Sequence, residues 1–333
     1  MNVVQPGEDM RRREIIAGIV GAMAAEPFVA QAQSRPAHIG FLGLAPATAW
    51  TEQFDALRAG LKDLGYVEGQ TFVIDFRLAD NVDQLPTYAA ELVSLNVDVI
   101  VAPASTEVEP ARRATTAIPI VFAQHADPVG LGHVASLPHP GGNITGVSMV
   151  LPEIAAKALE ILLDLIRGAE RVAVLWNPTT PSHHEVLRSL ERTAAKLDVR
   201  LVLTPASSVA DFDDAFASMA RERVQGFVVP SSPLTNSARD VLAQRELASR
   251  LPGIFVNREN VVAGGLMSYG ADFNYMYRHT AVYIDKILKG AKPADLPVEQ
   301  ASKYQLVLNL KTAKALGLEI PQSIYARADQ VIE

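Results

Sequence analysis

Short apolar, β-branched runs alternate with amphipathic segments along most of this chain, and this alternation constrains the fold more than any other feature. The first run is HIGFLGLA (38–45), and TEQFDALRAGLKDLGY (51–66) follows it with apolar residues at helical spacing. Similar runs return at VDVIVAPA (97–104) and RVAVLWN (171–177). Strands separated by helices of about 10–15 residues indicate βαβ units and a parallel sheet.

The alternation comes in two successive sets, and the Pro/Gly-rich passage LPHPGGN (137–143) lies near the seam between them. The second set begins with EIAAKALEILLDLI (153–166). Two sets predict an α/β fold of two doubly wound lobes. A helix near 273–289 and the strand YQLVLN (304–309) follow the second set. They predict that the chain recrosses to the first lobe, so that a hinge of several segments joins the lobes of a clamshell.

The N-terminal stretch RRREIIAGIVGAMAAEPFVAQAQS (11–34) combines three arginines, a short apolar run and the triplet Ala30-Gln31-Ala32. The run is too short to cross a bilayer, which takes about 20 apolar residues. This layout is typical of a cleaved export signal, and the pair Arg12-Arg13 suggests the twin-arginine route. A buried N-terminal helix is the alternative. We expect a signal at 1–32 and export to the periplasm.

The residues after the expected signal form the two lobes. We predict that lobe 1 comprises residues 36–149 and about 273–300, and that lobe 2 comprises residues 150–272 and about 301–333.

Composition excludes several classes of protein. The net charge of −7 without a basic run argues against a nucleic-acid partner. The chain has no cysteine, which excludes disulfides, thiolate nucleophiles, cysteine-ligated zinc and a lipidated cysteine anchor. We expect a monomer without a cofactor.

Ligands of open parallel sheets bind outside the carboxyl ends of the strands. The residues that follow the predicted strands are therefore the candidate ligand-binding residues. They are Trp50, Ser105, Thr106, Asp127, Trp176, Asn177, Ser231, Tyr269 and Asp272.

Three of these residues belong to the first set of strands and carry polar groups. Ser105 and Thr106 precede a helix, so their hydroxyls and the free backbone N–H groups suit a carboxylate, with ordinary N-capping as the alternative. Asp127 follows a strand and suits an ammonium group. A turn or cap before Pro128 is the alternative role for Asp127.

The aromatic candidates suit the apolar part of a ligand. Trp50 and Trp176 are the only tryptophans, and each lies at or just beyond the exit of the first strand of its lobe. Their flat surfaces suit stacking on a ring or covering an apolar ligand, with surface packing as the alternative. Tyr269 adds a hydroxyl, and Asp272 adds a second carboxylate.

Three long segments resemble a known family. They are FAQHADPVGLGHVASLPHPGGNITGVS, VNRENVVAGGLMSYGADF and ILKGAKPADLPVEQASKYQLVLNLKTAKALGLEIPQSI. These segments are similar to those of the substrate-binding proteins of TrpX-like ABC importers, and the resemblance covers nearly the whole chain after the signal.

The resemblance implies a type I periplasmic-binding fold that captures a small solute and delivers it to a membrane permease with its ATPase. Some members bind aromatic amino acids and others bind different solutes. By position, the resemblance places Ser105, Thr106 and Asp127 in the cleft of the first lobe. It places Asn177, Ser231 and Tyr269 in the matching segments of the second.

These observations predict the solute-binding component of an ABC importer, with an amino acid, aromatic or otherwise, as the leading ligand ahead of related carboxylates. Three alternatives stay open: an exported enzyme, a metal receptor and a receptor for a membrane sensor. The chain has no G-x-S-x-G, P-loop or H-E-x-x-H motif, and GLGHVA (130–135) lacks the setting of a dinucleotide site, so we expect no catalysis. His125, His133 and His139 are irregularly spaced for a metal.

Overall fold

A computed structural model of the chain describes residue 1, residues 35–44 and residues 46–333. Apart from Met1, the predicted export signal lies outside the described residues. Within residues 36–333 the strands form two sheets, one of six strands and one of seven.

The six-stranded sheet, which defines lobe 1, has the spatial order β11-β5-β4-β3-β1-β2, and all neighbouring strands in it are parallel. Its strands are β1 (Ala37–Leu44), β2 (Phe72–Ala79), β3 (Val99–Val101), β4 (Ile120–His125), β5 (Ile144–Ser148) and β11 (Glu299–Gln300). The order 2-1-3-4-5 of the first five is that of a doubly wound sheet.

The seven-stranded sheet, which defines lobe 2, has the order β13-β12-β10-β9-β8-β6-β7. Its strands are β6 (Arg171–Trp176), β7 (Arg200–Pro205), β8 (Gly226–Val229), β9 (Gly253–Phe255), β10 (Met267–Ala271), β12 (Tyr304–Asn309) and β13 (Gln330–Ile332). Only the β10–β12 pair is antiparallel among these described strands. The prediction of two doubly wound α/β lobes is confirmed.

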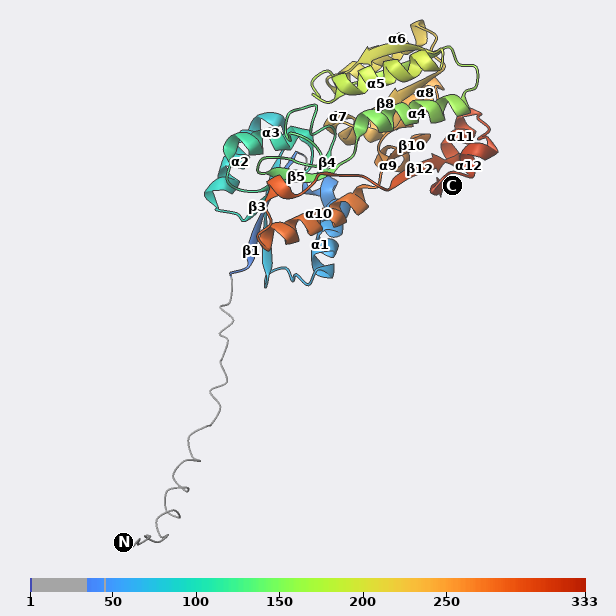
Figure 1. Cartoon of the computed structure of the whole chain (residues 1–333). Helices are drawn as coiled ribbons and strands as arrows, with labels where there is room; N and C mark the ends of the chain where they lie inside the picture. The colour runs from blue at the N-terminus through green and yellow to red at the C-terminus, as the bar shows by residue number, and fades with distance from the viewer. Residues whose placement is uncertain (2–34, 45) are drawn as a thin grey trace. The chain divides into compact units, whose positions relative to one another are not determined.

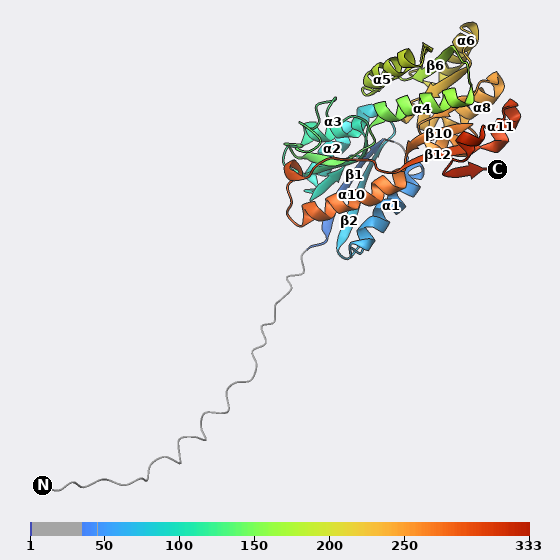
Figure 2. The same cartoon turned by 45° about the vertical axis from the view of Figure 1, so that its right-hand side comes forward.

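Helices cover both faces of the first sheet, as Figures 1 and 2 show. Helices α1 (Thr51–Asp63) and α10 (Phe273–Leu288) pack side by side on one face, with Phe41 and Val101 beneath them. Helices α2 (Leu85–Ser94) and α3 (Ser105–Ala114) cover the other face, where Leu42 and Ile100 lie. Because neighbouring residues of one strand point to opposite faces and both faces are buried, the inner strands β1 and β3 read as nearly continuous apolar runs.

The second sheet is covered in the same way. Helices α4 (Leu151–Leu165) and α5 (His183–Lys196) share a buried cluster with Val172 and Val174. Helices α6 (Phe212–Arg221) and α8 (Arg239–Ser249) share another cluster with Ala173 and Leu175. The short helices are α7 (Pro233–Ser237), α9 (Arg258–Val262), α11 (Leu310–Leu316), α12 (Gln322–Tyr325), and the 3₁₀ helices η1 (Ala47–Trp50), η2 (Val82–Gln84), η3 (Val209–Asp211) and η4 (Pro293–Asp295).

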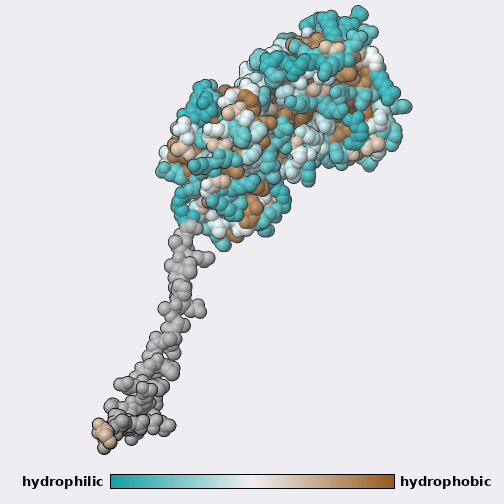
Figure 3. Space-filling model, in the orientation of Figure 1, coloured by the Kyte–Doolittle hydropathy of each residue, from teal (hydrophilic) through white to brown (hydrophobic). Residues whose placement is uncertain are grey.

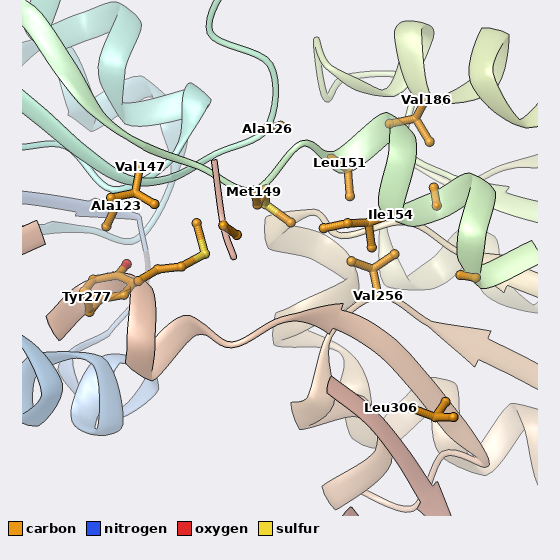
Figure 4. Close-up of a cluster of buried hydrophobic side chains, with 14 of the residues drawn as sticks. Ala123, Ala126, Val147, Met149, Leu151, Ile154, Val186, Val256, Tyr277 and Leu306 are labelled. Carbon is orange, nitrogen blue, oxygen red and sulfur yellow. The ribbon is translucent and has the colours of Figure 1, made fainter. Parts of the chain in front are cut away.

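The chain passes between the two sheets three times, after β5, after β10 and after β11. Backbone hydrogen bonds tie the crossings to each other: Ala301 N–H donates to the Ser148 carbonyl at 2.8 Å, and Asp272 N–H donates to the Lys303 carbonyl at 3.0 Å. Buried apolar side chains line this region, and Met149 of the first crossing is one of them (Figure 4). They belong to one cluster that also contains buried side chains of α1 and α4. The exact residue bounds of the lobes stay a prediction.

Two apolar runs of the sequence end early as strands because proline follows. The run predicted at 97–104 is a strand only over Val99–Val101, before Pro103. The similar run GFVVPSS (226–232) is a strand only over Gly226–Val229, before Pro230. Proline lacks the N–H group that the ladder requires.

Among the described helices, none is both long and apolar enough to cross a membrane. Figure 3 shows that hydrophilic residues cover most of the face in view, with smaller hydrophobic areas among them.

Gly146 of β5 occupies a position that admits no side chain. The β4–β5 register shifts between Phe122 and His125, and Gly146 has a φ of +145° beside this irregularity. A Cβ atom on Gly146 would lie 2.0 Å from the Phe122 carbonyl oxygen. The irregularity requires glycine because both the backbone angle and the close approach exclude other residues.

We predict that Gly146→Ala lowers the free energy of unfolding by about 2 kcal/mol or more, because the neighbouring strand must move. Urea denaturation followed by circular dichroism measures the change. Gly142→Ala is the matched control, since a Cβ atom there meets nothing within 4 Å, and we expect a change within about 0.5 kcal/mol. Equal stabilities of the two variants would contradict the prediction.

Candidate functional site

The parallel strands of each sheet bring their carboxyl ends to one edge, where most of the predicted ligand-binding residues lie. Trp50 ends η1 after β1, Ser105 and Thr106 open α3 after β3, and Asp127 follows β4. In lobe 2, Trp176 ends β6, Asn177 follows it, and Ser231 follows β8. Tyr269 lies within β10, and Asp272 follows that strand.

Ser105 and Asp127 are brought together by His125, which sequence reasoning considered only as a metal ligand. Ser105 Oγ lies 3.2 Å from His125 Nδ1 and accepts a hydrogen bond from Ala126 N–H at 3.2 Å. The N–H of Asp127 donates to the same Nδ1 at 3.2 Å. Both candidates are thus fixed around one imidazole, whose histidine is completely buried.

The Asp127 carboxylate also has a local structural role. Its Oδ1 accepts a hydrogen bond from Gly130 N–H at 2.8 Å, as in the turn that was its alternative role. Asp127 is half-buried, as is Thr106, the neighbour of Ser105 on α3. The pairing of Asp127 with a ligand ammonium group stays a prediction.

His125 continues into a chain of polar contacts. Its Nε2 lies 2.7 Å from Nδ1 of His133, and Nε2 of His133 lies 3.3 Å from Oε2 of Glu109. Burial lowers the pKa of both imidazoles. Within the described part of the chain, no group of three histidine, cysteine or acidic residues is placed to hold a metal ion.

A second histidine organises the edge of lobe 2. Asn177 N–H donates to Nδ1 of His183 at 3.0 Å, and Nε2 of His183 donates to the Ser231 carbonyl at 2.9 Å. Burial lowers the pKa of His183 to about 4, so the ring is neutral at pH 7. The Asn177 side chain accepts from both the N–H and the hydroxyl of Thr179. Asn177 and Ser231 therefore share one imidazole, as Ser105 and Asp127 do in lobe 1.

The two tryptophans differ in their surroundings. Trp50 is buried in an aromatic cluster with Phe41, Phe54 and Tyr277, at centroid distances of 5.7, 6.3 and 6.4 Å. Trp176 is half-buried, and its ring contacts His184 edge-on at 5.7 Å. The Trp50 contacts are those of core packing. Stacking of either ring on a ligand stays a prediction.

Tyr269 and Asp272 are positioned by β12 and its flanking residues. The Tyr269 ring stacks on Tyr304 at a centroid distance of 6.0 Å. Asp272 caps α10 through Tyr275 N–H at 3.0 Å, and its other oxygen accepts from the Gln305 side chain at 2.9 Å. Both residues thus have partners beside the crossing segments. The structure does not gather them around either imidazole.

Several buried polar atoms have no hydrogen-bond partner within the described part of the chain. They are Trp50 Nε1, Glu107 Oε2, Gln124 Oε1, Trp176 Nε1, Asn236 Oδ1, Asn257 Oδ1, Glu259 Oε2, Ser268 Oγ and Tyr277 OH. Gln124, Trp176 and Asn257 stand at or just past the carboxyl ends of β4, β6 and β9. An unpartnered buried polar group costs about 1–3 kcal/mol and calls for a water or a functional explanation. Their position favours the strand-end edges as the functional region.

Glu107 is a buried acid that sequence reasoning missed. It lies in the first turn of α3, and its Oε1 accepts a hydrogen bond from Leu44 N–H at 3.2 Å. Burial raises the pKa of Glu107 to about 8, so the carboxyl is largely protonated at pH 7. A glutamate in the first turn of a helix is ordinarily an exposed, charged residue. No local pattern of the sequence distinguishes the buried Glu107 from such an exposed glutamate.

Comparison with known proteins identifies the family. A family model described as "ABC transporter substrate binding protein" matches residues 45–332. The chain belongs to this family of ABC transporter substrate-binding proteins.

The similar proteins agree with that assignment. The substrate-binding protein is 28% identical to a tyrosine-binding protein of Clostridioides difficile over 262 residues, which are 78% of this chain and 74% of the relative. A structure from Streptococcus pneumonia, described as an ABC domain in complex with L-Trp, has a TM-score of 0.83 and 27% identity. It covers 89% of this chain and 100% of that one.

A conserved domain protein from Vibrio cholerae has a TM-score of 0.84 and 28% identity, with coverage of 89% and 100%. The predicted resemblance to TrpX-like proteins and the type I periplasmic-binding fold are confirmed.

The buried Glu107 makes the stability of the substrate-binding protein pH-dependent. Its pKa rises on folding from an ordinary value of 4.5 to about 8, so the folded state binds the proton more tightly than the unfolded state. The stabilisation is complete below about pH 4.5 and is lost as the pH rises toward 8, by about 1.4 kcal/mol per pH unit.

We predict that Glu107→Gln removes this slope, because the amide keeps an acceptor for Leu44 N–H and does not ionise. Urea unfolding between pH 5 and 8 gives the free energy of unfolding of the variant and of the wild type. The difference between the two at each pH reports Glu107 alone, because the other buried acids are present in both proteins. Glu191→Gln, at an exposed position of α5, is the control and should follow the wild-type curve. Parallel curves for Glu107→Gln and wild type would contradict the prediction.

Proposed function

We propose that this protein is the solute-binding component of an ABC importer and that its solute is an aromatic amino acid. The observation that carries the proposal is the similarity, over 89% of the chain, to a structure described as a complex with L-Trp. The tyrosine-binding relative supports the same class of solute. The closed pair of lobes delivers the solute to a permease with its ATPase, and the protein acts without catalysis.

The proposed ligand-binding residues come from both lobes. Lobe 1 contributes the group around His125, and lobe 2 contributes the group around His183. The full proposed set is Trp50, Ser105, Thr106, Asp127, Trp176, Asn177, Ser231, Tyr269 and Asp272. A solute that contacts both groups stabilises the closed arrangement, since a ligand shifts an equilibrium only by its differential affinity for the two states.

The proposed setting of this function is the periplasm. Export by the N-terminal signal, a monomeric state and a permease partner fit a freely diffusing receptor. The mildly acidic charge and the lack of cysteine support this setting.

We predict that L-Trp or L-Tyr raises the stability of the purified protein. A ligand at 100 times its dissociation constant adds about 2.7 kcal/mol, which a thermal-shift assay detects readily. Isothermal titration calorimetry then gives the affinity. L-Leu and divalent metal salts serve as comparison ligands. A shift with metal alone, or no shift with any aromatic amino acid, would refute the proposed solute class.

We also predict that Asp127→Asn weakens the binding of L-Trp by about tenfold or more. The variant keeps an acceptor for Gly130 N–H and removes the charge that would pair with the ammonium group. Asp83→Asn, at an exposed position of η2, is the control and should bind as wild type does. Calorimetry with an unchanged affinity for Asp127→Asn would remove Asp127 from the site.

A further inference from the structure

A buried hydrogen-bonded chain runs from Ser105 through two imidazoles to Glu109. The contacts are Ser105 Oγ to His125 Nδ1 at 3.2 Å, His125 Nε2 to His133 Nδ1 at 2.7 Å, and His133 Nε2 to Glu109 Oε2 at 3.3 Å. His125 is fully buried, and the His133 side chain is 6% exposed. We call this series of four residues the histidine relay.

One backbone group fixes the direction of the relay. The N–H of Asp127 can only donate, and it lies 3.2 Å from Nδ1 of His125. Nδ1 must therefore carry a lone pair, which places the ring proton on Nε2. That proton is donated to Nδ1 of His133, so His133 carries its own proton on Nε2, facing Glu109.

The hydrogen-bonding role of Glu109, at the other end of the relay, is also fixed. Glu109 accepts hydrogen bonds from Arg112 at 2.8 and 2.9 Å and from Arg113 at 2.7 Å. The hydrogen bond from Arg112 contributes most to lowering the pKa of Glu109 to about 2. The carboxylate is thus ionised at neutral pH and can only accept. Reversing the relay would set two donors against each other at the Asp127 end and two acceptors against each other at the Glu109 end.

The direction of the relay determines what Ser105 offers to a ligand. One lone pair of its Oγ is taken by Ala126 N–H at 3.2 Å, and its proton points to the Nδ1 lone pair of His125, which it shares with Asp127 N–H. The hydroxyl has one remaining site, a second lone pair. Ser105 therefore offers an acceptor.

We propose that Ser105 accepts a hydrogen bond from the α-ammonium group of the solute, and that His125 and His133 are the positioning residues that set this polarity. The proposal rests on the proposed function, because an amino acid supplies the ammonium donor. It replaces the carboxylate-binding role expected for Ser105 with the opposite one. Asp127, whose N–H shares the same imidazole nitrogen, is the neighbouring negative group.

The relay itself is tested without ligand by ¹⁵N NMR of the histidine rings. We expect His125 and His133 to be neutral at pH 7 with the proton on Nε2 in both. Protonation of Nδ1 in His125 would overturn the proposal. His133→Gln keeps an acceptor for His125 and should retain the Nε2–H form. His133→Leu removes the acceptor and should alter the His125 signals.

The role of Ser105 is tested with two analogues of L-Trp. L-Tryptophanamide keeps the amine and removes the carboxylate charge, and indole-3-propionate keeps the carboxylate and lacks the amine. We expect Ser105→Ala to weaken L-Trp and L-tryptophanamide alike, by roughly ten- to hundredfold, because the lost hydrogen bond involves a charged donor. We expect a change of less than about twofold for indole-3-propionate.

The outcomes separate this proposal from the proposed function. Binding of L-Trp to wild type, together with a Ser105→Ala loss as large for indole-3-propionate as for L-Trp, would overturn the proposal and leave the function standing. Absence of binding by any aromatic amino acid would overturn both. His133→Leu should reduce the preference for L-Trp over indole-3-propionate, and His133→Gln should restore it, which a purely structural role would not produce.

Discussion

A single buried apolar cluster spans the faces of both sheets, and the rest of the structure depends on it. It contains α1 and α10 of lobe 1, α4 and α5 of lobe 2, and the crossing residues between them. In Figure 4, Met149 lies between Tyr277 on one side and Ile154 on the other. Because protein interiors are close-packed, a change at the crossings is transmitted to both sheets. The clusters on the outer faces of the two sheets belong to one lobe each.

Some of the buried polar residues inside this framework lie where strands end. Two of them are neutral imidazoles, His125 at the end of β4 and His183 at the start of α5, and each accepts a hydrogen bond from a backbone N–H group. Each ring also contacts a candidate ligand-binding residue, Ser105 or Ser231. Burying these imidazoles costs desolvation free energy. In exchange, their hydrogen bonds fix the positions of the ring protons, which helps to recognise a small polar solute and contributes little to folding stability.

The sequence predicted most of the fold because buried parallel strands are apolar on both faces and stand out from the helices. Strand β11 consists of only two exposed polar residues, Glu299 and Gln300, so the sequence has no apolar run there that would predict a strand. The placement of most candidate residues at strand ends was predictable, and their contacts were less so. Tyr269 has a ring partner on β12, and Asp272 accepts from a side chain of the same strand, because that antiparallel strand lies beside β10. The contact between His125 and His133 depends on a loop whose path no periodicity encodes.

The interleaved course of the chain affects how the protein is made. The edge strand of lobe 1, β11, is synthesised about 150 residues after its neighbour β5. At typical ribosomal rates this gap lasts roughly 8 to 30 seconds. During that interval β5 has an open edge, and α10 has not yet covered its face of the sheet, so a nascent chain exposes both a strand edge and apolar surface. Neither lobe can be obtained by cutting the chain once, and a ribosome completes the sheet of lobe 1 only after it has made five strands of lobe 2.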